Sequence, residues 1–369
     1  MILYVYLGYP VLVFLLAMIK SKKVIKVAYD PAVTIIIAAY NEQENIETTL
    51  KNKLKLNYPK ENLEIVVVSD ASTDRTDDIV RKYEQHGVKL LRQEPRAGKT
   101  AALNMGVSQA KGKILVFSDA NSIYDSQALR MLVQNFSDPS VGYVTGKMIY
   151  TNLDGTTIGD GCTTYMKYEN VLRSLEMQLG SVVGVDGGID AVRKDLYRPM
   201  NPDQLPDLVL PLTVVEQGLR VVYEAEAILE EPVLKVPKDE YRMRVRVTVR
   251  ALWALWDMHH LLIFPRFKLF AWQLWSHKVL RYLCFLFIIL AYLTSLALWS
   301  ESGFYKLFFV LQNIAYLGAI ASPMLEKQGH CSPVLYLLNY FIILNLAAAH
   351  AFVKFIFGQK QVTWTPRKG

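Results

Sequence analysis

The sequence has few cysteines and few charged residues, and both shortages restrict what the chain can be. Its 369 residues include only 3 cysteines, whose wide spacing excludes a disulfide framework and any zinc site of the CxxC type. Charged residues make up 20%, below the roughly 25% of an ordinary soluble domain. Hydrophobic residues make up 52%, which excludes intrinsic disorder because such a chain has ample apolar surface to bury.

A long run without charge lies at the N-terminus. Residues 2–19 carry no Asp, Glu, Lys or Arg, and four lysines follow directly: Lys20, Lys22, Lys23 and Lys26. A secretory signal would have its charges before the apolar run and a small-residue cleavage site after it, and this run has neither. Its length suits a membrane anchor, and the lysines predict that the chain after it lies in the cytoplasm.

Three further uncharged runs lie near the C-terminus, at 282–300, 307–325 and 331–353, and each is long enough to span a bilayer. Buried core helices are the less favoured alternative, because a soluble protein rarely places so many uncharged helices in succession. The tail beyond carries Lys354, Lys360, Arg367 and Lys368 without an acid, which favours the cytoplasm. Three crossings after a cytoplasmic domain would instead leave that tail outside the cytoplasm. To resolve this conflict, either one of the apolar segments is re-entrant or interfacial, or residues 251–275 insert more deeply into the membrane.

The region between these ends has the sequence pattern of an α/β domain. The segments VTIIIAAYN, EIVVVSD and KILVFSD are short runs rich in Val and Ile that each end on a polar residue, and helical patterns separate them. Continuous apolar strands alternating with helices indicate a mostly parallel sheet covered on both faces. In such a doubly wound domain, we expect the ligand beyond the carboxyl ends of the strands.

Two strand ends carry acidic residues suited to ligand binding. Asp70 closes one strand and can accept hydrogen bonds from a base or ribose, whereas Asp74 is better suited to cap a turn or helix. Asp119 and Asn121 follow another strand, where a carboxylate and an amide oxygen can both reach a hard divalent cation. A DxN triplet alone is a common turn, but its alignment with Asp70 favours a ligand site.

A phosphate contact is predicted upstream, where Arg96-Ala97-Gly98-Lys99 leads into a helix. The glycine permits close backbone approach, and Lys99 can reach a phosphate. The segment is not a P-loop, because GxxxxGK[ST] is absent. Without context, a solvated helix start would be an equally good interpretation.

Taken together and in order, VTIIIAAYNEQENI, VVVSDASTD, RAGKTAALNMGV and ILVFSDAN resemble the inverting family 2 glycosyltransferases of the GT-A fold. The resemblance covers roughly residues 30–250, and the flanking apolar segments are similar to those of membrane-bound cellulose, chitin and hyaluronan synthase relatives. It implies a Rossmann-like, mostly parallel sheet in a catalytic domain flanked by transmembrane helices.

The resemblance assigns roles around a nucleotide-sugar donor, which is expected to be UDP-linked. Asp70 would contact the nucleobase, and Asp119 would bind Mg²⁺ or Mn²⁺ beside the diphosphate, with Asn121 as a second metal ligand. Lys99 and Arg244 would contact the donor's phosphates, although the Gln and Trp of the family's QxxRW motif are replaced around Arg244. The remaining residues of the nucleotide pocket would be Ala39, Tyr40 and Glu42.

The resemblance also assigns the reaction. Asp207, in LPDLVL, would be the general base that takes a proton from the acceptor hydroxyl, which attacks the anomeric carbon opposite the diphosphate in one inverting displacement. The GVDGG stretch would form the floor of the acceptor site through Gly184, Asp186, Gly187 and Gly188.

The expected division of the chain is a transmembrane anchor (1–27), a GT-A domain (28–234), amphipathic interfacial helices (235–277), transmembrane helices (278–357) and a basic tail (358–369). The expected partners are a nucleotide-sugar, a glycan or lipid-linked acceptor and membrane lipid, with no nucleic acid. The product would be a cell-surface or extracellular polysaccharide made at a bacterial-type plasma membrane, with the catalytic domain cytoplasmic. A silent nucleotide-sugar-binding or export-pore subunit, and a sugar-1-phosphate nucleotidylyltransferase, are the alternatives.

Overall fold

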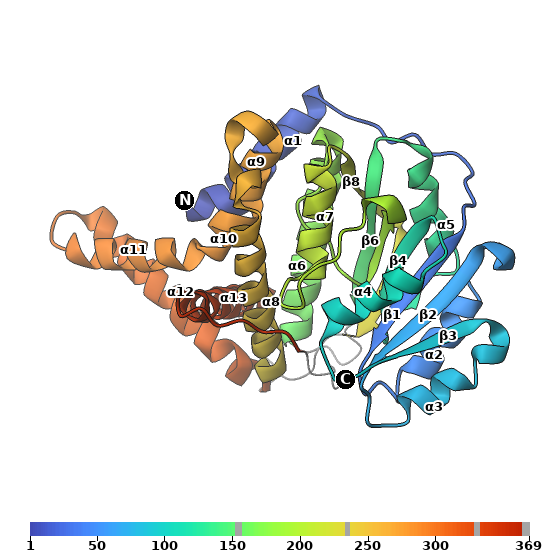
Figure 1. Ribbon diagram of the computed structural model, residues 1–369. Coiled ribbons are helices and arrows are strands. Elements are labelled where there is room, and N and C mark those ends of the chain that lie inside the picture. The colour runs from blue at the N-terminus through green and yellow to red at the C-terminus, as the bar shows by residue number, and fades with distance from the viewer. Residues whose placement is uncertain (152–156, 233–236, 328–332, 364–369) are drawn as a thin grey trace.

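In the computed structural model, which describes residues 1–151, 157–232, 237–327 and 333–363, one mixed sheet stands beside a helical region (Figure 1). The eight strands are ordered β3-β2-β1-β4-β7-β6-β8-β5. Their bounds are β1 (Val33–Ala39), β2 (Leu63–Asp70), β3 (Val88–Gln93), β4 (Ile114–Asp119), β5 (Ile123–Tyr124), β6 (Val141–Thr151), β7 (Ile189–Arg193) and β8 (Arg220–Pro232).

The first half of the sheet is parallel, as the sequence predicts, and the second half is mixed. Strand β1 pairs in parallel with β2 and β4, and β2 pairs in parallel with β3. Strand β7 then runs antiparallel to both β4 and β6. The prediction of an α/β domain is confirmed, with this antiparallel insertion as the detail that a mostly parallel sheet omits.

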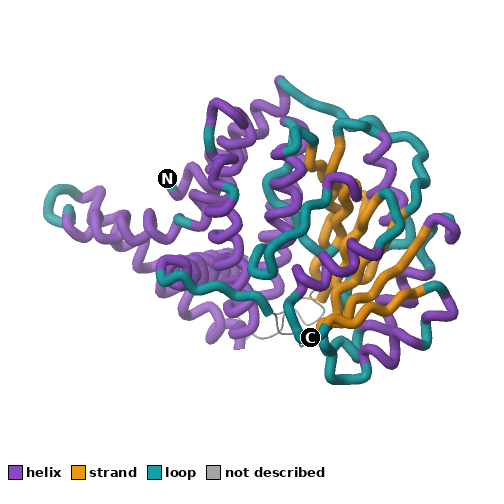
Figure 2. The backbone as a smooth tube through the Cα atoms, in the orientation of Figure 1, coloured by secondary structure: helices purple, strands orange, loops and turns teal. Residues whose placement is uncertain are grey.

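Helices cover both faces of the sheet and then continue as a separate helical region, which Figure 2 shows as the purple half of the molecule. A short π-helix (Tyr4–Gly8) precedes α1, and another (Trp275–Val279) joins α9 to α10. The helices are α1 (Tyr9–Ile19), α2 (Ile46–Leu54), α3 (Thr76–Arg81), α4 (Lys99–Gln109), α5 (Ala128–Val133), α6 (Thr157–Leu179), α7 (Pro206–Glu216), α8 (Pro237–Asp257), α9 (Phe264–Leu274), α10 (Leu280–Tyr282), α11 (Cys284–Ala297), α12 (Gly303–Lys327) and α13 (Pro333–Ile356).

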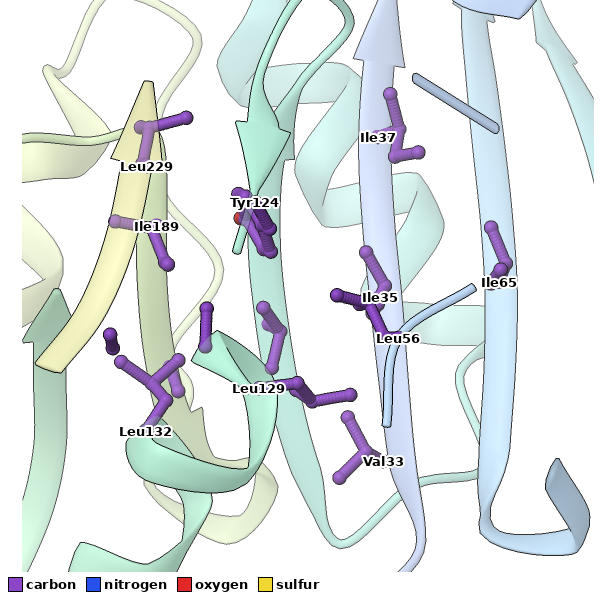
Figure 3. Packing of buried hydrophobic residues seen from close by; sticks show 14 of the residues in the cluster. Val33, Ile35, Ile37, Leu56, Ile65, Tyr124, Leu129, Leu132, Ile189 and Leu229 are labelled. Atoms are coloured by element: carbon purple, nitrogen blue, oxygen red, sulfur yellow. The ribbon is translucent and has the colours of Figure 1, made fainter. Parts of the chain in front are cut away.

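Strand alternation divides the core into two layers. In β1, Ile35 and Ile37 point to one face, where Figure 3 shows them packed with Leu56 and Leu129. Ile36 and its alternate neighbours point to the other face, against α4, α7 and α8. All seven residues of β1 are buried, which explains why the strand reads as an unbroken apolar run rather than as an alternating one.

The helical region includes two helices long and apolar enough to cross a membrane, Gly303–Leu325 and Pro333–Ile356. The first predicted C-terminal span instead lies in a pair of helices, Phe264–Tyr282 and Cys284–Ala297, bent by 59°. The N-terminal apolar helix, Tyr4–Ile19, is shorter than these spans. Its role as a transmembrane anchor therefore stays a prediction.

Helix α8 connects the sheet to the apolar helices. Ala251 and Leu255 pack into the core layer under the sheet, whereas Val245 and Val249 pack against Ala347 and its neighbours on α13. A helix enclosed on two sides in this way fixes the core layer under the sheet against α13. The predicted interfacial position of residues 235–277 stays a prediction.

The chain after α13 returns to the sheet domain. Lys360 forms an ion pair with Asp203 at 2.5 Å, and the Trp253 indole donates a hydrogen bond to the Gln359 carbonyl at 2.9 Å. The Val362 carbonyl lies so near Gly98 that a Cβ on this glycine would approach it to 2.7 Å. Residues 359–363 thus lie on the domain that contains β1; Arg367 and Lys368 of the predicted tail lie outside the described residues.

Candidate functional site

Two cavities meet beside Asp207. The rim pocket, of about 130 Å³, lies beyond the carboxyl ends of β1 and β4 and is lined by Ala38, Glu42, Lys99, Asp119, Asn121, Arg246 and Arg250. The inner cavity, of about 230 Å³, lies between α6, α8, α10 and α13 and is lined by Tyr165, Glu169, Arg173, Lys278, Arg281 and Asn345. Asp186 and Asp207 line both cavities. A molecule in either cavity therefore reaches the same pair of carboxylates.

In the rim pocket, Asp119 ends β4 opposite Ala38 of β1. Its carboxylate pairs with the Lys99 ammonium at 2.5 Å, and the two side chains are 28% and 20% exposed. Lys99 is the first residue of α4. The structure thus brings the predicted Lys99 and Asp119 together, with the lysine as the counter-ion of the carboxylate.

A buried lysine supports the strand end beneath this pair. The Lys53 ammonium donates to the Ser122 carbonyl at 2.7 Å and lies 3.3 Å from the centre of the Tyr124 ring. Burial holds the pKa of Lys53 well below its usual value, against the opposing charges of Asp119 and Glu231. This contact fixes the turn that presents Asp119 and Asn121.

The donor set in the rim pocket fits a divalent metal that arrives with phosphate oxygens. No cluster of three or more His, Cys, Asp or Glu with metal-binding geometry occurs among the described residues. Mg²⁺ commonly uses one or two carboxylates and completes its shell with water and substrate phosphates. Asp119 with Asn121 meets that minimum, provided that Lys99 leaves the carboxylate.

Asp70 is less accessible than its predicted role requires. The residue is 0% exposed. Its carboxylate accepts backbone N–H bonds from Ala97 at 2.8 Å and Gly98 at 3.0 Å, and a side-chain bond from Gln93 at 2.5 Å. Asp70 thus closes the 96–98 loop over the end of β2, and contact with a nucleobase stays a prediction that needs this loop to move.

The residues predicted after β1 are divided between two faces. Ala38 lines the rim pocket, whereas the side chain of Ala39 is buried in the opposite core layer, because successive strand residues point to opposite faces. The prediction that Ala39 lines the pocket is therefore off by one residue, because the side chain of Ala38 lines it instead. Glu42 lines the pocket as expected, and the Arg96 guanidinium stacks 3.4 Å from the centre of the Tyr40 ring.

Asp207 lies in the first turn of α7, after Pro206. Proline at the first helical position needs no N–H partner, so the helix starts where the cavities meet. Gly187, at φ +82°, lies directly against the carboxylate: an added Cβ would approach Cγ and Oδ2 of Asp207 to 2.3 Å. Only glycine therefore permits this position of Asp207, which brings the predicted Gly187 and Asp207 together.

Asp190 is a site residue that the sequence did not indicate. It lies in β7, opposite Phe117 and Thr145, and is 1% exposed. Burial and the nearby charge of Asp207 raise the pKa of Asp190 to about 8, so this carboxyl is mainly protonated at neutral pH. It therefore adds no full negative charge beside Asp207.

Arg173 of α6 holds the GVDGG segment. Its guanidinium pairs with both carboxylate oxygens of Asp186, at 2.5 and 2.6 Å, and donates to the Gly184 carbonyl at 3.0 Å. Burial raises the pKa of Asp186 despite the opposing charge of Arg173. Gly188 faces Leu229, since a Cβ there would approach that side chain to 2.6 Å, so its direct contact with an acceptor stays a prediction.

Arg244 does not occupy the predicted phosphate position. Its guanidinium pairs with Glu240 at 2.7 Å and donates to the Tyr340 hydroxyl at 2.6 Å, on the side of the inner cavity. Arg246 and Arg250 line the rim pocket instead. Residues two apart on a helix point about 200° apart, so matching the arginine by distance along the chain selected the wrong face of α8.

A buried ionic network lines the inner cavity behind these loops. Glu169 and Glu176 of α6 face the two ring nitrogens of His277, at 3.1 and 2.7 Å, and Glu169 also pairs with Arg281. Burial opposes ionisation of Glu169, but the charges of Arg281, His277 and Lys278 together with the His277 hydrogen bond outweigh it and hold the pKa of Glu169 well below its usual value. Sequence analysis missed this network because its partners are more than 100 residues apart.

Residues 34–195 match the family model described as "Glycosyl transferase family 2". Two curated relatives are "Probable glycosyltransferase YdaM" of Bacillus subtilis (strain 168), 29% identical over 231 residues, and "Poly-beta-1,6-N-acetyl-D-glucosamine synthase" of Staphylococcus aureus (strain COL), 28% identical over 235 residues. The alignments cover 58% and 62% of this chain and 54% and 56% of the relatives. The chain thus spans about half the length of the curated relatives it matches.

A solved structure shares the fold over almost the whole chain. It is a mannosyltransferase, PcManGT from Pyrobaculum calidifontis, determined in complex with GDP-Man and Mn²⁺. The two chains are 22% identical with a TM-score of 0.69, and the match covers 97% of each. The likeness extends beyond the sheet domain to the helical region.

Proposed function

We propose that this chain, which carries a glycosyltransferase family 2 domain, transfers a sugar from a nucleotide-sugar to an acceptor at a membrane. The observation that carries the proposal is the position of Asp207 between two cavities. The rim pocket presents basic side chains and Asp119 for a diphosphate, and the inner cavity supplies separate space for an acceptor.

The donor is proposed to bind in the rim pocket. Lys99, Arg246 and Arg250 offer positive charge to the phosphates, and the nucleoside would extend towards Glu42 and Tyr40. Asp119 and Asn121 are the residues that would hold a divalent metal, which when bound neutralises charge on a departing diphosphate. We expect EDTA to abolish nucleotide release and added Mn²⁺ to restore it.

Asp207 is proposed to act as the general base. It takes a proton from the acceptor oxygen, which attacks the anomeric carbon from the inner cavity while the nucleotide diphosphate leaves into the rim pocket. Because the two cavities lie on opposite sides of the reacting carbon in this arrangement, one displacement inverts the anomeric configuration. The buried, largely protonated Asp190 avoids a second negative charge beside the base.

The test uses the purified full chain in lipid vesicles with UDP- and GDP-linked sugars supplied separately. Asp207→Asn is expected to lower transfer by at least about 100-fold, the usual contribution of a general base, while donor binding is retained. Asp195→Asn, an exposed carboxylate on the same domain, is the matched control and should keep full activity. Normal transfer by Asp207→Asn would overturn the assignment, and donor binding without transfer in the unmutated chain would favour a silent subunit.

A further inference from the structure

We propose that the inner cavity binds the phosphate headgroup of a membrane lipid as the acceptor, with Lys278 as its counter-ion. This inference rests on the proposed transferase activity and names the acceptor class for the same site. The cations that line the inner cavity differ in what they already bind.

Three of the cavity's cations are held by protein carboxylates. Arg173 forms its two-bond pair with Asp186, Arg281 pairs with Glu169, and Arg244 pairs with Glu240. These guanidinium groups shape the cavity wall, and Arg173 supports the GVDGG segment. Their charge is matched by partners within the protein, so none of the three is the best candidate for binding an incoming anion.

Lys278 differs from these arginines. Within the described residues its ammonium has no hydrogen bond or ion pair, although it lines the inner cavity. The charges that act on it from α6 are Glu169, Glu176 and Arg173, and the two glutamates are already engaged by His277. An ammonium has three donors, and a cavity that leaves all three without a protein acceptor is suited to an anionic ligand.

The backbone is shaped around this ammonium. A Cβ on Gly184 would approach Nζ of Lys278 to 2.3 Å and Cε to 2.8 Å, just as a Cβ on Gly187 would approach the Asp207 carboxylate. The two glycines are three positions apart in the chain, so their Cα atoms lie at most about 11 Å apart. The unpaired cation and the proposed base therefore line the same short stretch of backbone, and one headgroup can contact both.

The cavity has room for a phosphate with a small attached group. Its volume is about 230 Å³, and a water molecule needs only about 10–15 Å³ of space measured in this way. A phosphate also offers anionic oxygens to Lys278, which a neutral glycan cannot.

The surrounding helices favour a lipid source for that phosphate. Leu344, Asn345 and Ala348 of α13, a candidate membrane span, form one wall, and Tyr6 of the N-terminal apolar helix forms another. Outside the cavity, that helix exposes Leu3 and Leu7, which are 74% and 62% exposed. A lipid tail can pack on this apolar surface while its headgroup occupies the cavity.

The reaction balances with an oxygen of the headgroup as the acceptor. The bond between the anomeric carbon and the nucleotide diphosphate breaks, and its electron pair leaves on the diphosphate. The headgroup oxygen forms the new bond to that carbon, and any proton it carries passes to Asp207. Lys278 positions the phosphate and takes no part in the proton transfer.

The experiment measures transfer and nucleotide release by the full chain in phosphatidylcholine vesicles that contain either a polyprenyl monophosphate or the matching polyprenol. A third arm supplies a soluble sugar phosphate instead. We expect transfer to the lipid phosphate alone. Equal transfer to the polyprenol would overturn the need for phosphate, and equal transfer to the soluble compound would overturn the lipid source.

Variants then test Lys278 itself. Lys278→Met should raise the KM for the lipid phosphate at least tenfold, and Lys278→Arg should restore much of the affinity. Lys306→Met, an exposed lysine on α12, is the matched control. An unchanged acceptor KM in Lys278→Met overturns the inference while leaving the transferase intact. Absence of donor binding and nucleotide release in the unmutated chain would instead overturn the transferase proposal and, with it, this inference.

Discussion

At the scale of single residues, the site combines two carboxyl groups in different surroundings. Asp207 borders both cavities, whereas Asp190 is buried in β7 with a pKa of about 8. An unfolded Asp titrates near 3.9. Between these two pH values the folded protein keeps a proton that the unfolded chain has lost, so the stability contributed at this position falls as the pH rises from about 4 to about 8.

Asp190→Asn should remove this pH dependence, because an amide has no proton to lose in that range. Relative to the unmutated protein, we expect the variant to gain up to about 1.4 kcal/mol per pH unit across the window. Thermal unfolding at pH 5, 6.5 and 8, with Asp195→Asn as the control, measures the effect. A melting-temperature difference that does not change with pH would contradict it.

Gly187 provides a second residue-scale prediction. In Gly187→Ala, the new Cβ would overlap the Asp207 carboxylate, and a displacement of about 1 Å can cost roughly 100-fold in rate. We expect kcat to fall by that order with donor affinity retained. Gly218→Ala is the control, because Gly218 has nearly the same positive φ but nothing within 4 Å of its Cβ position.

The position of Asp119 was predictable from local pattern because this residue ends a strand. The position of Asp207, in the first turn of α7, came only from the family resemblance, and the roles of both residues stay predictions. Asp190 and Lys278 were not predictable, since their significance comes from neighbours on other elements rather than from local pattern. Ala39 was misplaced by one position because a strand buried on both faces gives no alternation from which to judge direction.

At the scale of elements, the phase of α8 decides which arginines face which cavity. Arg246 and Arg250 are four residues apart on the rim-pocket side, and Arg244 lies on the inner side with Glu240. The sequence predicted a basic helix here, but a motif matched by position alone does not report helix phase. Helical periodicity through Met243, Arg246, Val247 and Arg250 would have identified the correct face.

Arg246→Ala should therefore weaken donor binding, whereas Arg242→Ala, on an exposed position of the same helix, should not. A hydrogen bond to a charged group contributes about 1.5–3 kcal/mol, so we expect a rise in the Kd for the nucleotide-sugar of roughly tenfold or more. Calorimetric titration of the full chain with UDP and GDP provides the measurement. Equal affinities in the two variants would show that helix phase does not set the donor contact.

At the scale of the whole molecule, the C-terminal segment determines how many times the chain can cross a membrane. Residues 359–363 lie against Asp203, Trp253 and Gly98, on the sheet domain. The chain between α8 and this segment must therefore cross an even number of times. Crossings by α12 and α13 alone satisfy this requirement, with the bent pair before them re-entrant or lying along the bilayer.

We accordingly expect a tag at the C-terminus to lie on the same side of the membrane as the sheet domain. Protease protection in sealed vesicles should cleave both a C-terminal tag and an exposed loop of the sheet domain, or protect both. Cleavage of one with protection of the other would contradict the arrangement. A C-terminus on the side of the sheet domain also agrees with the positive charge of the tail, which favours the cytoplasm and which three crossings would place outside it.

The contact between Gly184 and Lys278 has an evolutionary consequence. A side chain at position 184 would displace the Lys278 ammonium, because an added Cβ would lie 2.3 Å from its Nζ. Substitution of Gly184 is therefore expected to follow loss of the lysine among relatives. Homologues that keep both residues would be expected to use charged acceptors, and lineages that replace the lysine would be free to enlarge the glycine.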